Sequence, residues 1–269
     1  MKKKGLKRLI PKFLRGPLEG LRSRNSMIPP KSLSFVGKGD FESTGKEFMK
    51  HFVELAGLQP GDRVLDVGCG IGRMAVPLTG YLSPQGGYWG FDIVRRGIDW
   101  CQERITPKFG NFRFQHSDVY NKHYNPDGKV QARDYRFPFE NDFFDFVFLT
   151  SVFTHMVPED MENYMREIVR VLKPDGKCLV TFLLLNEESA DLIRAGKSKY
   201  DFAHDMGGYF TTRPTDPEAA IAYEEASVLR RLDLSGLDVV QPVRYGSWCG
   251  RARHLSYQDI VVAVKRRPF

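Results

Sequence analysis

The sequence lacks any uninterrupted apolar run of the roughly 18 residues that a membrane-spanning helix requires. Cysteine is also scarce. The four cysteines lie too far apart to suggest a zinc knuckle or a disulfide framework. No internal repeat is present. These absences argue against a membrane-spanning protein, a disulfide-rich protein and a repeat protein, so we expect a globular protein of the reducing cytoplasm.

Basic residues are in excess, but they are unevenly distributed. The 269 residues include 40 Lys and Arg and 33 Asp and Glu, which gives a formal net charge of +7. Residues 1–31 hold ten of the basic side chains and one acid, so this N-terminal arm carries +9 and the rest of the chain −2. A slightly acidic body does not favour an enzyme whose whole surface binds nucleic acid. We therefore expect two parts, the arm 1–31 and one domain over 32–269.

The arm is also partly amphipathic. Leu6, Leu9, Ile10 and Phe13 recur at helical spacing among basic residues, and Pro11 disfavours a long straight helix. Three interpretations fit this pattern: a mobile cationic tail, a peripheral contact with an anionic membrane at its inner surface, and a contact with RNA or an acidic partner.

From about residue 46 onward, helical and strand patterns alternate. The predicted strands are 63–67, 88–92, 111–115, 144–149, 177–184, 238–245 and 257–264. The predicted helices are 73–79, 97–105, 160–172, 187–196 and 217–234. This order predicts an α/β fold with a doubly wound, mostly parallel sheet. Ligands of such sheets bind at the carboxyl ends of the strands.

A glycine-rich turn follows the first predicted strand. Glycines at 68, 70 and 72 would let backbone N–H groups approach a ligand closely. The nicotinamide fingerprint would need glycine at position 73, where the chain has Arg73. The carboxylate of Asp66, two residues before the first glycine, suits a ligand that carries an ammonium group.

The stretch from Asp66 to Gly72 resembles the D-x-G-x-G-x-G motif of class I S-adenosylmethionine-dependent methyltransferases. Later acids fit the same family. Asp92 ends the second predicted strand, 20 residues after Gly72, and Asp118 follows the third. The resemblance covers about residues 46–184 and implies a Rossmann-like seven-stranded sheet whose last strand is antiparallel.

The resemblance implies S-adenosylmethionine as the methyl donor and gives each acid a role. Asp66 would hold the amino end of the donor, Asp92 its ribose hydroxyls and Asp118 its adenine. Ile93 and Val119 would lie on the two faces of the base. The full implied donor site is Asp66, Gly68, Cys69, Gly70, Gly72, Asp92, Ile93, Asp118, Val119 and Thr150.

Methyl transfer to a hydroxyl needs a base that takes the hydroxyl proton. His155 follows the fourth predicted strand, where the base should lie, and imidazole titrates near neutrality. The alternative is that His155 only precedes the next helix and shapes the pocket. No tight His/Asp spacing suggests a metal site, so we expect none.

The acceptor should contact segments that depart from the minimal family pattern. Two of these are predicted insertions, about 121–136 and 186–226, and a third is the turn at 245–251. Their candidate substrate-binding residues are His123, Tyr124, Tyr209, Tyr245 and Trp248. The alternative for each aromatic is packing within a lid. Residues 33–41 are expected to fold over the donor, with Phe35 as the anchor.

Together these features predict methyl transfer to a hydroxyl of a small molecule, a glycan or a lipid-linked intermediate. Two alternatives stay open. One is a methyltransferase of RNA or protein that uses the arm as an anchor. The other is a non-catalytic S-adenosylmethionine-binding partner protein.

Overall fold

The computed structural model describes residues 26–33, 35, 37 and 39–267. Most of the arm 1–31 lies outside the described residues, so its three interpretations stay predictions. No helix among the described residues is both long and apolar enough to cross a membrane.

Seven strands form the main sheet, in the order β10-β11-β5-β4-β1-β2-β3. They are β1 (Arg63–Val67), β2 (Gly87–Asp92), β3 (Phe112–His116), β4 (Phe144–Leu149), β5 (Leu172–Phe182), β10 (Leu237–Val239) and β11 (Asp259–Lys265). Only β11 runs antiparallel to its neighbours, β5 and β10. The pairs from β5 to β3 are all parallel. The predicted doubly wound sheet with an antiparallel last strand is confirmed.

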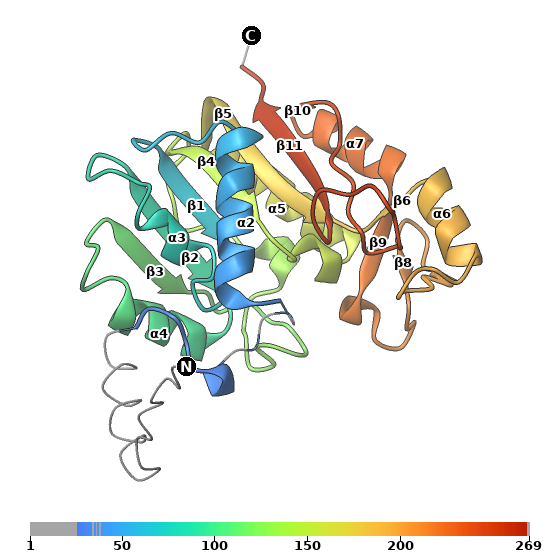
Figure 1. The fold of residues 1–269 in the computed structure, drawn as a ribbon, viewed down its shortest axis with the longest axis horizontal. Helices are drawn as coiled ribbons and strands as arrows, with labels where there is room; N and C mark the ends of the chain where they lie inside the picture. The colour runs from blue at the N-terminus through green and yellow to red at the C-terminus, as the bar shows by residue number, and fades with distance from the viewer. Residues whose placement is uncertain (1–25, 34, 36, 38, 268–269) are drawn as a thin grey trace, which may run out of the picture.

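Helices cover both faces of this sheet (Figure 1). They are α2 (Phe41–Glu54), α3 (Ala75–Leu78), α4 (Arg95–Arg104), α5 (Pro158–Val171), α6 (Glu187–Arg194) and α7 (Glu225–Leu234). On one face, the Phe52 ring of α2 lies 4.3 Å from Phe148 and 5.3 Å from Phe146, measured between ring centroids. On the other, the buried side of α5 includes Met165 and Ile168. The sheet is therefore the middle of three layers.

A second, smaller sheet lies beside the main one, in the region of the predicted insertion 186–226. Its order is β6-β9-β8-β7. The strands are β6 (Leu184–Leu185), β7 (His204–Asp205), β8 (Phe210–Thr211) and β9 (Ile221–Glu224). The predicted helix 217–234 is wrong over β9, because Ile221, Ala222 and Tyr223 are all buried and pair with neighbouring strands. Four short 3-10 helices complete the described fold: η1 (Lys31–Leu33), η2 (Ala132–Asp134), η3 (Phe153–His155) and η4 (Pro217–Ala219).

The predicted strand 238–245 is also shorter in the structure. The continuous strand β10 ends at Val239, and the chain then makes an isolated bridge between Arg244 and Ile260. Pro242 interrupts this stretch because proline has no N–H to donate to the ladder.

Candidate active site

The glycine-rich turn lies at the carboxyl end of β1. Gly68, Gly70 and Gly72 have φ angles of 80°, 58° and 79°, in the left-handed region that favours glycine. The backbone N–H of Gly68 donates to the carbonyl of Phe91 at 2.9 Å. A Cβ atom at Gly68 would lie 2.6 Å from Cγ2 of Val152. The turn is therefore bound to β2 and packed against the segment that follows β4.

Asp92 ends β2 and holds this turn from the other side. Its Oδ2 accepts the N–H of Gly70 at 2.7 Å, and its Oδ1 accepts the N–H of Val94 at 2.7 Å. Burial raises the pKa of Asp92, while the two backbone donors act to lower it. Each carboxylate oxygen keeps acceptor capacity for a further hydrogen bond. Asp92 is thus fixed in place and able to accept from a pair of hydroxyls.

Asp66 lies next to this turn and is completely buried. Its Oδ2 accepts the hydroxyl of Tyr88 at 2.6 Å. Its Oδ1 is buried and has no hydrogen-bond partner among the described residues. Burial raises the pKa of Asp66 to about 8. A buried acceptor without a partner is costly, so this oxygen suits a ligand that brings a donor or a cation.

The segment after β3 adjoins Asp92. The N–H of Ser117 donates to the Asp92 carbonyl at 2.9 Å, and the ring Nε2 of His116 lies 3.1 Å from the Ile93 carbonyl. The Asp118 side chain is exposed, while Val119 is buried. Parallel strands thus bring Asp66, Asp92, Ile93, Asp118 and Val119 to one edge of the sheet. Their roles toward the donor stay predictions.

The segment after β4 carries a polar network that the sequence did not reveal. Ser151 follows Thr150 and has a φ angle of 59°, which is unusual for a residue with a Cβ atom. Its N–H donates to Oγ1 of Thr181 at 2.8 Å, and its hydroxyl donates to Oε1 of Gln258 at 3.0 Å. Thr181 also donates to Gln258, at 2.7 Å. The only sequence signal was a lone threonine in an otherwise apolar strand.

His155 ends η3, just beyond this network. Its Nδ1 lies 2.7 Å from the carbonyl oxygen of Glu218. A carbonyl oxygen only accepts, so Nδ1 carries the proton and Nε2 presents a lone pair. Burial lowers the pKa of His155, which keeps the ring neutral near pH 7. This is the protonation state that a general base requires.

The two predicted insertions meet close to His155. Asn121 donates to the carboxylate of Glu218 at 3.1 Å. His123 and Lys122 both contact Asp216, at 2.8 and 3.3 Å. The candidate His123 therefore lies in the same cluster of contacting residues as Glu218, whose carbonyl oxygen orients His155.

Tyr209 joins this cluster through Tyr223, whose ring centroid lies 6.4 Å away. The Tyr223 hydroxyl donates to the carbonyl of Met156 at 2.5 Å, which ties β9 to the residue after His155. Tyr223 is one of the aromatic residues of the predicted insertion 186–226, and it connects this insertion to the segment that carries His155.

Of the other predicted substrate-binding residues, Tyr124 follows His123 in this cluster, and its backbone N–H donates to Oδ1 of Asn121 at 3.0 Å. Tyr245 and Trp248 lie elsewhere. Trp248 is buried and its indole N–H donates to Asp259 at 2.6 Å. Tyr245 donates to Glu225 at 2.8 Å, and Tyr124 is 45% exposed. Among the described residues, no hydrogen bond or ring contact joins these three to His155 or to the glycine-rich turn. Trp248 thus has a packing role here.

The ring of Phe35 packs against the first turn of α4, close to the glycine-rich turn. The guanidinium of Arg96 sits 5.0 Å from the centre of its ring. A Cβ atom at Gly97 would lie 2.9 Å from Cζ of Phe35 and 2.5 Å from the Gly70 carbonyl. Phe35 is therefore near the predicted donor site, and its role as an anchor over the donor stays a prediction. The described residues contain no cluster of three or more potential metal ligands.

Comparison with known proteins gives one family match. Residues 65–180 match a family model described as a methyltransferase domain. Curated relatives include phosphoethanolamine N-methyltransferase 1 of Arabidopsis thaliana, which is 30% identical over 54% of this chain and 26% of its own length. Another is phthiotriol/phenolphthiotriol dimycocerosates methyltransferase 1 of Mycobacterium ulcerans, which is 34% identical over 49% of this chain and 41% of its own length. The chain thus spans less than half the length of either relative.

Solved structures show the same fold. The PH0226 protein of Pyrococcus horikoshii OT3 superposes with a TM-score of 0.60 over 87% of this chain and 95% of that one. The two sequences are 17% identical, so this likeness bears on the fold alone.

Proposed function

We propose that this chain, whose residues 65–180 match a methyltransferase domain, is a class I S-adenosylmethionine-dependent methyltransferase and transfers a methyl group to a small acceptor. The observation that carries this proposal is the pairing of a fixed Asp92 with the glycine-rich turn. Such a turn with an acid at the end of the next strand suits a nucleoside with a ribose diol.

The residues present fit the donor. Asp92 has acceptor capacity for the ribose hydroxyls, and the lack of a partner for Oδ1 of Asp66 supports a contact with the cationic amino group of the donor. S-Adenosylmethionine would supply an activated methyl group on a sulfonium sulfur. The chain's own part is then to bind the donor, orient the acceptor and remove a proton.

We propose a hydroxyl acceptor with His155 as the base. Nε2 of His155 takes the hydroxyl proton as the acceptor oxygen forms its bond to the methyl carbon. The bound donor would supply the methyl group and would keep the electrons of its carbon–sulfur bond on sulfur, which leaves it neutral at that atom. His155 becomes a cation, and the Glu218 carbonyl that holds Nδ1–H stabilises that form.

The acceptor class we favour is a small molecule, a glycan or a lipid-linked intermediate. The names of the two relatives support a small or lipid acceptor rather than a macromolecule: one acts on phosphoethanolamine and the other on phthiotriol dimycocerosates. An amine acceptor is therefore the second candidate. The neutral His155 could equally take a proton from an ammonium group.

The experiment is methyl transfer from labelled S-adenosylmethionine into a fractionated cell extract. Label in the lipid, glycan or small-molecule fraction supports the proposal. Hydrolysis of the labelled product by base then distinguishes a methyl ester from a methyl ether, and retention on a cation exchanger identifies a methylamine. Label in RNA or protein, or in no fraction, contradicts it.

We also propose that the arm 1–31 brings the domain to an anionic membrane surface. Its net charge of +9 supports this, because each basic residue near such a surface adds about 1 kcal/mol of attraction. Sedimentation with vesicles of anionic lipid should retain the full chain and lose a variant without residues 1–25. Equal binding of both would contradict the proposal.

A further inference from the structure

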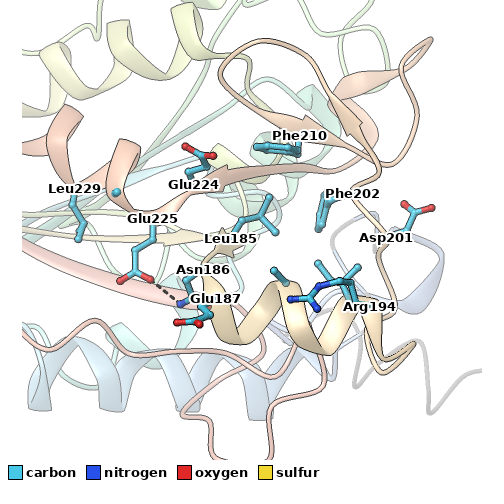
Figure 2. Close-up of a pocket in the computed structure, with 13 residues that line it drawn as sticks. Leu185, Asn186, Glu187, Arg194, Asp201, Phe202, Phe210, Glu224, Glu225 and Leu229 are labelled. Atoms are coloured by element: carbon cyan, nitrogen blue, oxygen red, sulfur yellow. Dashed lines mark hydrogen bonds between the residues drawn. The ribbon is translucent and has the colours of Figure 1, made fainter.

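A hollow of about 780 Å³ lies between α6 and the start of α7, over the small sheet (Figure 2). None of the residues that line it belongs to the glycine-rich turn, to the segment after β4 or to the predicted substrate-binding residues. Its volume is in the range of pockets that bind small organic molecules. Most of the lining belongs to the insertion 186–226, but neither His155 nor the predicted donor-binding residues line the hollow.

The interior surface of this hollow is mainly apolar. Leu185, Ile193, Phe202, Phe210 and Leu229 contribute aliphatic or aromatic side chains. In Figure 2, Leu185, Phe202 and Phe210 face the space above α6. Such a surface would bind the hydrocarbon part of a ligand.

The polar residues that line the hollow are predominantly acidic. Glu187, Glu224, Glu225 and Asp201 contribute four carboxylates, against a single guanidinium from Arg194. Arg194 also donates to Asp191, so its charge is already paired. The lining is therefore electrostatically suited to a cation.

Glu225 is held in place by two hydrogen bonds. Its Oε1 accepts the hydroxyl of Tyr245 at 2.8 Å, and its Oε2 accepts Nδ2 of Asn186 at 2.8 Å, as the dashed line in Figure 2 shows. Both donors are neutral. No ion pair links Glu225 to a cation among the described residues. A fixed carboxylate beside an apolar surface is a preorganised partner for a ligand cation.

The two residues that donate to Glu225 both contact a buried arginine, Arg251. The guanidinium of Arg251 donates to Oδ1 of Asn186 at 2.9 Å and lies 4.5 Å from the centre of the Tyr245 ring. Arg251 pairs with Asp259 and Glu188, at 3.1 and 2.7 Å. Arg251 forms its ion pairs with these two carboxylates and none with Glu225. It therefore orients Asn186 and Tyr245, the two neutral groups that donate to Glu225.

We propose that this hollow binds an organic cation with an apolar body, such as an amphipathic amine. The ammonium group lies against Glu225, and the hydrocarbon part covers Leu185, Phe202 and Phe210. This site is separate from the donor-binding residues and its occupancy does not require methyl transfer.

Calorimetric titration of the full chain with three matched probes tests the proposal: 4-phenylbutylamine, 4-phenylbutanol and 4-phenylbutyrate. The amine should bind at least about tenfold more tightly than the alcohol, and the anion should bind least. Glu225→Gln should remove the preference for the amine and leave the affinity for the alcohol unchanged. Equal binding of all three probes, or an unchanged preference in Glu225→Gln, would overturn the proposal.

A second pair of variants locates the binding. Ala226 lines the hollow and is exposed, so Ala226→Trp should fill the space and abolish binding of the amine. Ala252→Trp places the same side chain at an exposed position outside the hollow and should bind like the wild type. Binding that survives Ala226→Trp, or that is absent from the wild type, contradicts the assignment.

Discussion

The two sides of the proposed active site are built differently. The donor side, residues 66–119, is held by contacts between neighbouring strands: Asp92 bonds to Gly70, and Tyr88 to Asp66, each 22 residues away. The acceptor side comprises His155, the polar network around Ser151 and the two insertions. Its contacts join residues much farther apart, 63 for His155 and Glu218 and 107 for Ser151 and Gln258. A motif of fixed spacing can describe the first arrangement but not the second.

This difference predicts that the two sides can be damaged separately. Changes on the donor side should alter donor affinity, and changes on the acceptor side should alter turnover while donor affinity stays the same. The predictions that follow test this separation, beginning with the largest effect.

His155→Ala should lower kcat about 100- to 1000-fold, the usual contribution of a general base. Donor affinity should not change.

In the wild type, protonation removes the base. The pKa of His155 in the free protein is lowered, so kcat/KM should fall on the acid side with its midpoint below 6.5. Steady-state kinetics across pH measure both effects, and His254→Ala is the control at an exposed histidine. A kcat within a few-fold of wild type would leave His155 as a pocket residue only.

Donor affinity should depend on pH through Asp66. In the free protein its pKa is about 8, so near pH 6 the carboxyl is protonated. A cationic donor favours the carboxylate and lowers this pKa, so binding releases a proton. Affinity should then rise by up to about tenfold per pH unit between 6 and 8, and level off above 8.

Calorimetry in buffers of different ionisation enthalpy measures this proton release. Asp66→Asn has no carboxyl to titrate and should give a flat profile. A rise with pH that persists in Asp66→Asn would place the titrating group elsewhere.

Gly68→Ala should weaken donor binding about tenfold and lower the free energy of unfolding by about 1–3 kcal/mol. The new Cβ would lie 2.6 Å from Val152 Cγ2, in a residue whose φ angle is 80°. Gly61→Ala is the matched control, because no atom lies within 4 Å of its Cβ position. Denaturant unfolding and donor titration of both variants measure the difference. Identical behaviour of the two would show that the turn tolerates a side chain.

Tyr223→Phe should have the smallest effect, a loss of about 1 kcal/mol in the free energy of unfolding. The hydroxyl that it removes donates to Met156, beside His155. We expect a few-fold lower kcat and an unchanged donor affinity. A change in donor affinity as large as the change in kcat would break the separation between the two sides.

The same contrast explains what the sequence could predict. The alternation of strands and helices in the main sheet and the placement of Asp66, Asp92 and Asp118 follow from local patterns and motif spacing. The antiparallel last strand was implied by the family resemblance. The small sheet does not, because a four-residue strand such as Ile221–Glu224 reads like part of a helix until its partner, β6, is known. Trp248 was expected to meet the acceptor, and only the buried Asp259 shows why it packs in the interior.

The most direct test of the account is donor binding by the purified protein. Titration calorimetry with S-adenosylmethionine should show one site in the wild type, an affinity at least about 100-fold lower in Asp92→Ala, and wild-type affinity in Asp99→Ala on the exposed surface of α4. The absence of binding by the wild type, or equal affinity in Asp92→Ala, would contradict the assignment of this chain as a methyltransferase that holds its donor at the end of β2.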